Sequence, residues 1–327
     1  MCDTASMTIS RRRFLALSAT FTVAACSSDG TDLARPESAG STTPTEPSAT
    51  DAPTGSAPGP TLAPAPEATT TITDFESPDV KLSSDPFVFG VASGDPDSES
   101  VVIWTRLGGD LSEVETPTGE IPVDWTFTTD SGIELAGTVM TSPAIGSSVH
   151  ITIPTTAPGS YSFSAGGFTS PSGRTAPINP AATEFRIAAA SCQHYETGFY
   201  AAHGDIADWK PDLVMFLGDF MYEGAAGELG GAVVRQHEGP EPTDIDGYRA
   251  RYATYLSDPQ LQRSRAAAPW LTIWDDHEVE NNYAGVISEN DDDPATFARR
   301  RANAYQVWWE NTPTRLDPPS EDANPED

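Results

Sequence analysis

The chain has 327 residues, 48 of them acidic and 18 basic, so its formal net charge is −30, and its length allows about two domains. This charge, with Lys81 and Lys210 as the only lysines, excludes the basic surface that nucleic acids require and disfavours adsorption to anionic lipid. The three cysteines, Cys2, Cys26 and Cys192, are too far apart in sequence for a disulfide framework or a C-x-x-C zinc site.

The first 26 residues are typical of an export signal. Residues 10–15, Ser-Arg-Arg-Arg-Phe-Leu, form a twin-arginine pattern. The apolar stretch at 14–25 has the length of a signal h-region and is shorter than the roughly 20 residues of a membrane-spanning helix. It ends in Val-Ala-Ala-Cys, which resembles a bacterial lipobox with Cys26 as the acylated N-terminus. We therefore expect the twin-arginine translocase to export a lipoprotein that the lipid on Cys26 holds at the cell surface or in the periplasm.

Residues 27–84 are rich in Ser, Thr, Pro and Ala. A segment of this composition cannot bury enough apolar surface to offset the entropy lost on ordering. We expect a solvated linker, semi-extended by its prolines, between the lipid anchor and the folded body.

Residues 85–180 predict an all-β antiparallel sandwich. Short runs rich in Val, Ile, Thr and aromatic residues alternate there with Gly, Pro and Ser, at a spacing of about 8–12 residues. Period-two alternation places His150 on the outward face of its strand. No residue of this domain is surrounded by a group of catalytic side chains. We therefore expect the domain to be a scaffold or positioning module without a catalytic role of its own. The clearest expected strands are 101–107, 123–129, 137–140, 149–153 and 161–165.

Residues 184–327 predict an α/β domain. Continuous apolar runs are typical of buried strands, and alternation of such strands with helices indicates a largely buried sheet. The expected elements, in chain order, are strand 185–190, helix 200–209, strand 212–217, helices 248–256 and 259–267, strand 270–274 and helix 294–309.

Chemistry-bearing side chains follow each of the three predicted strands. Cys192 follows the first, Asp219 and Tyr222 follow the second, and Asp276 and His277 follow the third. Taken singly, Cys192 could be a buried apolar residue and Asp219 a turn cap. Tyr222 could equally be a core residue, and Asp276 part of a helix cap. Ligands bind outside the carboxyl ends of strands in open α/β sheets, so the three ends together favour a metal site.

Three motifs resemble those of the alkaline phosphatase D family, within the calcineurin-like metallophosphatase superfamily. They are Ser-Cys-Gln at 191–193, Gly-Asp-Phe-Met-Tyr-Glu at 218–223 and Trp-Asp-Asp-His-Glu-Val-Glu-Asn-Asn at 274–282. Residues 89–96 and 101–106 are similar to the start of the family's N-terminal sandwich. The resemblance implies an exported enzyme that hydrolyses phosphate mono- and diesters with Fe³⁺ and Ca²⁺, the ester bridging the metals.

Ligand chemistry suggests a role for each residue in that scheme. Cys192 as thiolate and Tyr222 as phenolate are strong anionic donors suited to Fe³⁺. Asp219 can bridge two cations with one oxygen for each. Asp276 and Asn281 offer the hard oxygen ligands that Ca²⁺ prefers.

The four histidines of the predicted α/β domain divide into one catalytic candidate and three others. His277 stands beside the ligands, where it can protonate the leaving oxygen or stabilise the transition state. In related metallophosphatases the motif is Gly-Asn-His-Glu, so Asp276 stands where they have asparagine. This leaves open whether Asp276 or Asn281 contributes more to coordination. We expect His194, His203 and His237 on loop surfaces or around the site, not among its ligands.

Two other functions stay open from the sequence. One is phospholipase D-type cleavage of a lipid head-group diester by the same metals. The other is a surface protein whose catalytic part is inactive because it is incomplete. The motifs supply fewer ligands than a binuclear centre needs, no histidine follows His277, and the family's remaining ligands lie further C-terminal. We therefore expect a C-terminally truncated metallophosphatase domain with weak metal binding and no turnover, whose Asp276 strand or its neighbour is an uncovered edge.

Overall fold

The computed structural model describes residues 6–10, 80–109, 111, 119–227 and 233–319. The arginines at 11–13, the lipobox with Cys26 and most of the linker lie outside these residues. Export, lipid anchoring and the linker therefore stay predictions. None of the helices in the described part of the chain has the length and apolar composition that crossing a membrane requires.

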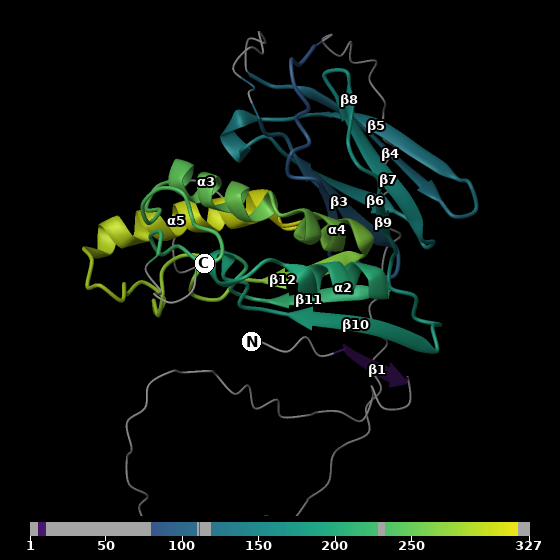
Figure 1. Ribbon diagram of the computed structural model, residues 1–327. Helices are drawn as coiled ribbons and strands as arrows, with labels where there is room; N and C mark the ends of the chain where they lie inside the picture. Colours follow the sequence, from purple (N-terminus) through teal and green to yellow (C-terminus); the bar gives the residue numbers. More distant parts are fainter. Residues whose placement is uncertain (1–5, 11–79, 110, 112–118, 228–232, 320–327) are drawn as a thin grey trace, which may run out of the picture. The chain divides into compact units, whose positions relative to one another are not determined.

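Twelve strands are assigned in the described residues, and they form two sheets (Figure 1). The strands are β1 (Ser6–Ser10), β2 (Val91–Gly94), β3 (Ser100–Arg106), β4 (Pro122–Thr129), β5 (Glu134–Met140), β6 (Ser148–Pro154), β7 (Gly159–Ala165), β8 (Phe168–Thr169), β9 (Gly173–Thr175), β10 (Glu184–Ala190), β11 (Leu213–Leu217) and β12 (Pro269–Ile273). The larger sheet has the order β1-β10-β11-β12-β2-β3-β6. The smaller has the order β5-β4-β7-β8, with β9 paired to β7.

The larger sheet is mixed. Strands β10, β11 and β12 are mutually parallel, whereas β3 is antiparallel to both of its neighbours, β2 and β6. Parallel pairing of β12 with β2 joins the two halves, and Gly94 makes this possible because a Cβ there would collide with the backbone of Trp270 and Pro313. One mixed sheet thus contains strands from both predicted domains, whereas the expectation was a sandwich followed by a separate α/β sheet. The expected uncovered edge at the Asp276 strand is wrong, since β11 and β2 flank β12.

Four α-helices and the three parallel strands share one apolar core. The helical elements are η1 (Pro143–Ile145), η2 (Tyr195–Thr197), α2 (Ala201–Trp209), α3 (Ile245–Leu256), α4 (Pro259–Ala267) and α5 (Pro294–Asn311). Helices α4 and α5 each begin with proline after an aspartate cap, Asp258 and Asp293, whose side chains accept backbone amides of the first turn. Val214, Phe216 and Trp270 point from the strands into this core. The predicted strands and helices agree with these elements to within a few residues at each end.

The opposite face of the parallel strands is apolar and exposed. Leu217 is 49% exposed, Leu271 38% and Ile273 56%. Because side chains alternate between the faces of a strand, these residues point away from the helices that cover Phe216 and Trp270. In the described part of the chain, helices therefore cover one face of this parallel region only.

The smaller sheet packs on β3 and β6 over a second apolar core. In β7 every second residue is buried, which places Tyr161 and Phe163 in that core with Ile103 and Phe127. This is the pattern expected of antiparallel strands with one face covered.

One expectation about this region is wrong. His150 does not face outward: its ring stacks on Trp309 of α5 with 4.2 Å between centroids, and both ring nitrogens are buried. Burial lowers the pKa of His150 to about 4, so the ring is neutral at physiological pH. The sequence pattern of β6 alone could not show that α5 covers this position.

Candidate metal centre

The loops that follow β10, β11 and β12 are hydrogen-bonded to one another. The backbone amides of Cys192 and Gln193 donate to the carbonyls of Gly218 and Asp219, at 3.2 and 3.1 Å. The Asp219 amide in turn donates to the Glu278 carboxylate at 3.1 Å. Parallel neighbouring strands end at one edge of a sheet, so these contacts gather the three motifs at one place.

The backbone at two of the strand ends is unusual. Cys192 and Asp219 each have φ of +55°, in the left-handed region that residues other than glycine rarely adopt. Between them in space, Gly218 has φ of +91°, and a Cβ there would lie 2.5 Å from Cβ of Asp275. Such outliers cluster at functional sites, where the surrounding structure holds them.

Asp219, Asp276 and His277 each offer a ligand atom, and these atoms lie within 4.8 Å of one another. We name these three residues the strand-end cluster. The Tyr222 hydroxyl donates to Asp219 Oδ2 at 2.9 Å, and the Cys192 thiol also interacts with both side chains. Asp219 Oδ1 is buried and has no hydrogen-bond partner in the described part of the chain. An unpaired buried carboxylate oxygen is costly, and a cation would satisfy it, so the donor set fits a metal.

Burial and neighbouring negative charge raise the pKa of three side chains at this site. Burial raises the pKa of the Asp219 carboxyl, and the Asp276 charge adds to this effect. Burial also raises the pKa of Cys192 and of Tyr222, and the neighbouring Asp219 charge raises both further. A bound cation reverses this effect because it stabilises the anionic forms.

Asp276 and Asn281 are held by the loop that carries them. Asp276 accepts the amides of His277 (3.0 Å) and Asn282 (2.6 Å), one on each carboxylate oxygen. The side-chain nitrogen of Asn281 donates to Glu289 at 2.7 Å. Each carboxylate oxygen of Asp276 keeps a second lone pair, and the Asn281 carbonyl oxygen is a further acceptor, so both residues can still coordinate.

Glu223 is a candidate functional residue that the sequence analysis missed. It is 4% exposed, and its Oε2 lies 2.8 Å from Nδ1 of His277 while its Oε1 accepts the Asn281 amide at 2.6 Å. Burial lowers the pKa of His277, but the Glu223 hydrogen bond and charge, together with the charges of Asp219 and Asp276, outweigh burial, and the net shift is upward. Glu223 thereby fixes the orientation of the His277 ring. The sequence shows that Glu223 directly follows Tyr222, but it does not show that Glu223 pairs with His277.

Glu278 is a second missed residue. It is 1% exposed and accepts the amides of Asp219, Phe220 and Asp275, at 3.1, 2.6 and 2.9 Å. Burial raises its pKa to about 7 despite these amides. Glu278 ties the loop after β11 to the loop after β12. No sequence rule distinguishes it from an exposed glutamate.

A cavity of about 250 Å³ adjoins the strand-end cluster. His277, Tyr222 and Asn281 lie in its wall. The remaining lining residues, many of them acidic, are His194, Glu223, Gly224, Ala225, Glu241, Glu280, Glu289 and Asn290. A substrate that enters here meets His277 and Tyr222 directly.

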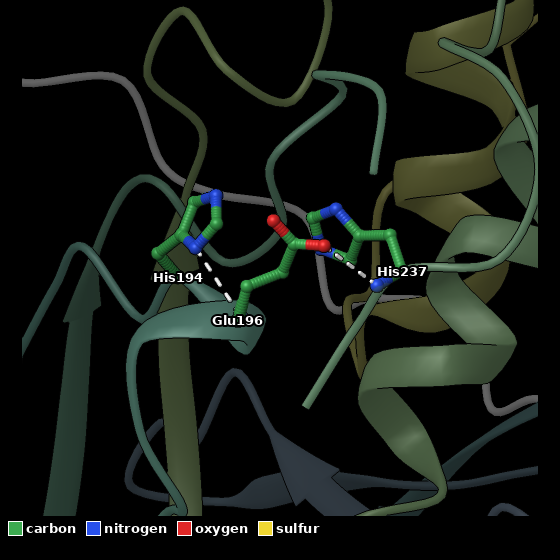
Figure 2. Close-up of side chains that lie close together, drawn as sticks. All are labelled: His194, Glu196 and His237. Carbon is green, nitrogen blue, oxygen red and sulfur yellow. Dashed lines mark hydrogen bonds between the residues drawn. The ribbon is translucent and has the colours of Figure 1, made fainter. Parts of the chain in front are cut away.

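A second group with metal-type side chains lies beside this cavity. His194, Glu196 and His237 also place their ligand atoms within 4.8 Å, and Figure 2 shows the Glu196 carboxylate between the two imidazole rings. We name these residues the loop cluster. Glu196 Oε1 accepts the amides of His237 (2.9 Å) and Gly227 (3.1 Å), and His194 Nδ1 accepts the Glu196 amide at 3.2 Å. Both carboxylate oxygens of Glu196 thus hold backbone amides, which fits an anchor for the loop between β11 and α3, while Nδ1 of His237 is left without a partner among the described residues.

The structure shows where the three other histidines lie, and their exclusion from the ligands stays a prediction. His203 and His237 are 4% and 3% exposed, so neither is on a loop surface. His203 Nε2 lies 2.7 Å from the side-chain oxygen of Gln193, directly after Cys192. His194 packs edge-on against Tyr222 with 4.6 Å between ring centroids. All three thus lie around the site.

Comparison with known proteins gives two family matches. Residues 73–178 match the PhoD-like phosphatase, N-terminal domain, and residues 187–325 match PhoD-like phosphatase. Alkaline phosphatase D of Bacillus subtilis (strain 168) is 42% identical over 247 residues, which are 72% of this chain and 42% of that protein. A solved structure described as "Structure of PhoD" is similar with a TM-score of 0.67 at 42% identity, covering 72% of this chain and 48% of that chain. The chain therefore spans less than half the length of both.

Proposed function

This chain belongs to the PhoD-like phosphatase family, and from that premise we propose that it serves metal-dependent hydrolysis of phosphate mono- and diesters. The observation that carries the proposal is the buried, unpartnered Oδ1 of Asp219. It lies among the hydroxyl of Tyr222, the thiol of Cys192 and the carboxylate of Asp276, which act on Asp219 electrostatically or by hydrogen bonds. A site built from anionic donors, with an oxygen at its centre that has no partner among the described residues, supports a bound cation.

We propose Fe³⁺ and Ca²⁺ as the cations. Cys192, Tyr222 and Asp219 would hold Fe³⁺, because thiolate and phenolate donors suit a trivalent metal. Asp276 and Asn281 would hold Ca²⁺ through hard oxygens. When bound, such cations lower the pKa of a coordinated water and neutralise charge on the phosphoryl group.

Residues of the chain itself orient the proposed general acid and transfer the proton. Glu223 engages Nδ1 of His277, so Nε2 is the nitrogen left for proton transfer to the leaving oxygen. The same glutamate holds the backbone of Asn281, which fixes the proposed acid and a proposed ligand with one carboxylate. Preorganisation of this kind reduces the motion needed to reach the transition state.

Metal analysis combined with three substrates tests the proposal. The proposal predicts that the purified protein contains iron and calcium and hydrolyses a chromogenic phosphomonoester and a chromogenic phosphodiester, whereas the alternative of an incomplete catalytic part predicts weak metal binding and no turnover. Asp219→Asn should abolish both metal content and turnover, whereas Asp208→Asn, on the exposed surface of α2, should preserve them. Hydrolysis of phosphatidylcholine alone would favour the phospholipase D-type reaction instead. Full turnover after complete removal of metal would contradict the proposal.

We further propose that the protein is exported by the twin-arginine translocase and anchored through Cys26. The support is the order of arginines, apolar stretch and lipobox at residues 10–26. Arg11→Lys combined with Arg12→Lys should leave the precursor in the cytoplasm, and Cys26→Ser should prevent acylation. Export of the double variant in cells without this translocase would contradict the route.

A further inference from the structure

Arg265, on helix α4, is a buried cation without an anionic partner. It is 2% exposed and forms no ion pair among the described residues. Its Nη2 donates to the Asn311 carbonyl at 2.6 Å, and its guanidinium lies over the rings of Trp104 (4.4 Å) and Phe220 (5.7 Å). Burial lowers the pKa of Arg265 to about 10, which leaves it charged at neutral pH. Its Nη1 is buried and has no hydrogen-bond partner in the described part of the chain.

Tyr252, on helix α3, presents a second polar atom of the same kind. It is 1% exposed, and its hydroxyl likewise has no partner among the described residues. Arg265 and Tyr252 act on each other electrostatically and line one small cavity of about 10 Å³. Phe220, Thr272 and Asn311 form part of its wall. Two residues that each carry an unsatisfied donor, one of them cationic, thus line a single small cavity.

We propose that this cavity is an internal binding site for a small monovalent anion of the chloride class, held between Arg265 Nη1 and the Tyr252 hydroxyl. A guanidinium N–H can only donate, and an anion accepts from it while compensating its charge. A cavity of this volume suits one water-sized particle, which excludes phosphate and carboxylate ligands. Asn311 does not compete for the space, because its side-chain oxygen accepts from Arg106.

The nearby carboxylate does not take the anion's place. Glu278 is the acidic group whose charge acts on Tyr252, but its oxygens accept three backbone amides and it does not line the cavity. The site lies against Phe220, the residue after Asp219, and is thus separate from the strand-end cluster but directly beside its loop. An anion that binds only the folded protein stabilises it by mass action.

Thermal unfolding in sodium chloride and in sodium gluconate of equal ionic strength tests the site. In the wild type we expect the midpoint to rise with chloride and to saturate. Tyr252→Phe removes one donor with little change of volume and should weaken the apparent chloride affinity about tenfold, the value of one hydrogen bond to a charged group. Tyr248→Phe is the matched control, because it removes a hydroxyl from the same helix that donates to Val279 and does not line the cavity.

Crystals grown in sodium bromide provide the second measurement, an anomalous peak in the cavity. A chloride response that is lost in Tyr252→Phe and kept in Tyr248→Phe, together with this peak, supports the proposal. An identical response in both salts, an unchanged response in Tyr252→Phe, or density without anomalous signal would show that water fills the cavity and would overturn it. Arg265→Met should abolish the chloride response. If this variant fails to fold, the chloride response of Tyr252→Phe decides whether the proposal stands.

Discussion

The strand-end cluster and the loop cluster present similar side chains and differ in what those side chains already bind. Both contain carboxylate and imidazole, and both bring their ligand atoms within 4.8 Å. In the strand-end cluster, Asp219 Oδ1 has no partner in the described chain. In the loop cluster, both oxygens of Glu196 accept backbone amides, although Nδ1 of His237 is buried without a partner in the described chain. Proximity of donors therefore does not define a metal site, and what distinguishes the two clusters is whether a buried carboxylate oxygen is left unpaired.

The difference follows from where each cluster stands. The strand-end cluster sits after parallel strands, where Glu278 and Glu223 accept several of the loop amides and Asp219 Oδ1 has no partner among the described residues. The loop cluster sits beside the connection between β11 and α3, whose described residues form no strand. Its amides at Gly227 and His237 must find side-chain acceptors, and Glu196 supplies them.

The largest expected effect comes from breaking the strand-end cluster. Asp219→Asn removes the charge at its centre, and we expect metal affinity and turnover to fall at least about 100-fold, because even residues that only orient ligands contribute about 10–100-fold. Elemental analysis and phosphodiesterase assays measure this. Glu196→Gln, the corresponding change in the loop cluster, should leave metal content unaltered. Equal metal loss in both variants would contradict the distinction.

The second prediction concerns the orientation of His277. Glu223→Gln keeps the shape of the side chain but removes the charge, and we expect kcat to fall about 10–100-fold with KM nearly unchanged. Glu223→Asp should recover part of the loss. The control is Glu238→Gln, which changes an exposed glutamate in the neighbouring loop. A rise in KM with unaltered kcat would assign Glu223 to substrate binding instead.

The third prediction sharpens the role of the loop cluster. Glu196→Gln places an amide where backbone N–H groups need acceptors, so we expect a loss of about 1–3 kcal/mol in the free energy of unfolding. Urea denaturation measures it. The same experiment on Glu238→Gln should give a change within about 0.5 kcal/mol. An undiminished stability of Glu196→Gln would mean that the amides of Gly227 and His237 find other partners.

The smallest expected effect is a pH dependence of stability from His237. Burial, with the Arg251 charge, lowers its pKa from 6.5 to about 4 in the folded protein. The unfolded chain therefore binds more protons between these values, and this contribution to stability falls as the pH drops from 6.5 towards 4. We expect a loss of about 1 kcal/mol between pH 6.5 and 5. Subtraction of the His237→Gln curve isolates it, and superimposable slopes would refute the assignment.

The sequence by itself determined the local features of this protein. Apolar runs and their periods predicted the strands that became β10, β11 and β12, and the sequence also indicated helices at 259–267 and 294–309, which became α4 and α5. The motifs after each strand identified Cys192, Asp219 and Tyr222 as neighbours, since parallel strands end at a common edge. These are short-range properties, and a window of a few residues contains all the information that they need.

Only the tertiary structure decided the pairings between distant residues. It joined β12 to β2, placed Trp309 over His150 and set Glu223, 54 residues earlier in the chain, against His277. It also separated the loop cluster from the strand-end cluster, which have the same kinds of side chain. Sequence patterns report which face of an element is apolar, but the partner on that face depends on how elements far apart in sequence pack. Hydrogen-bond saturation, which distinguishes an anchor from a ligand site, exists only after that packing is complete.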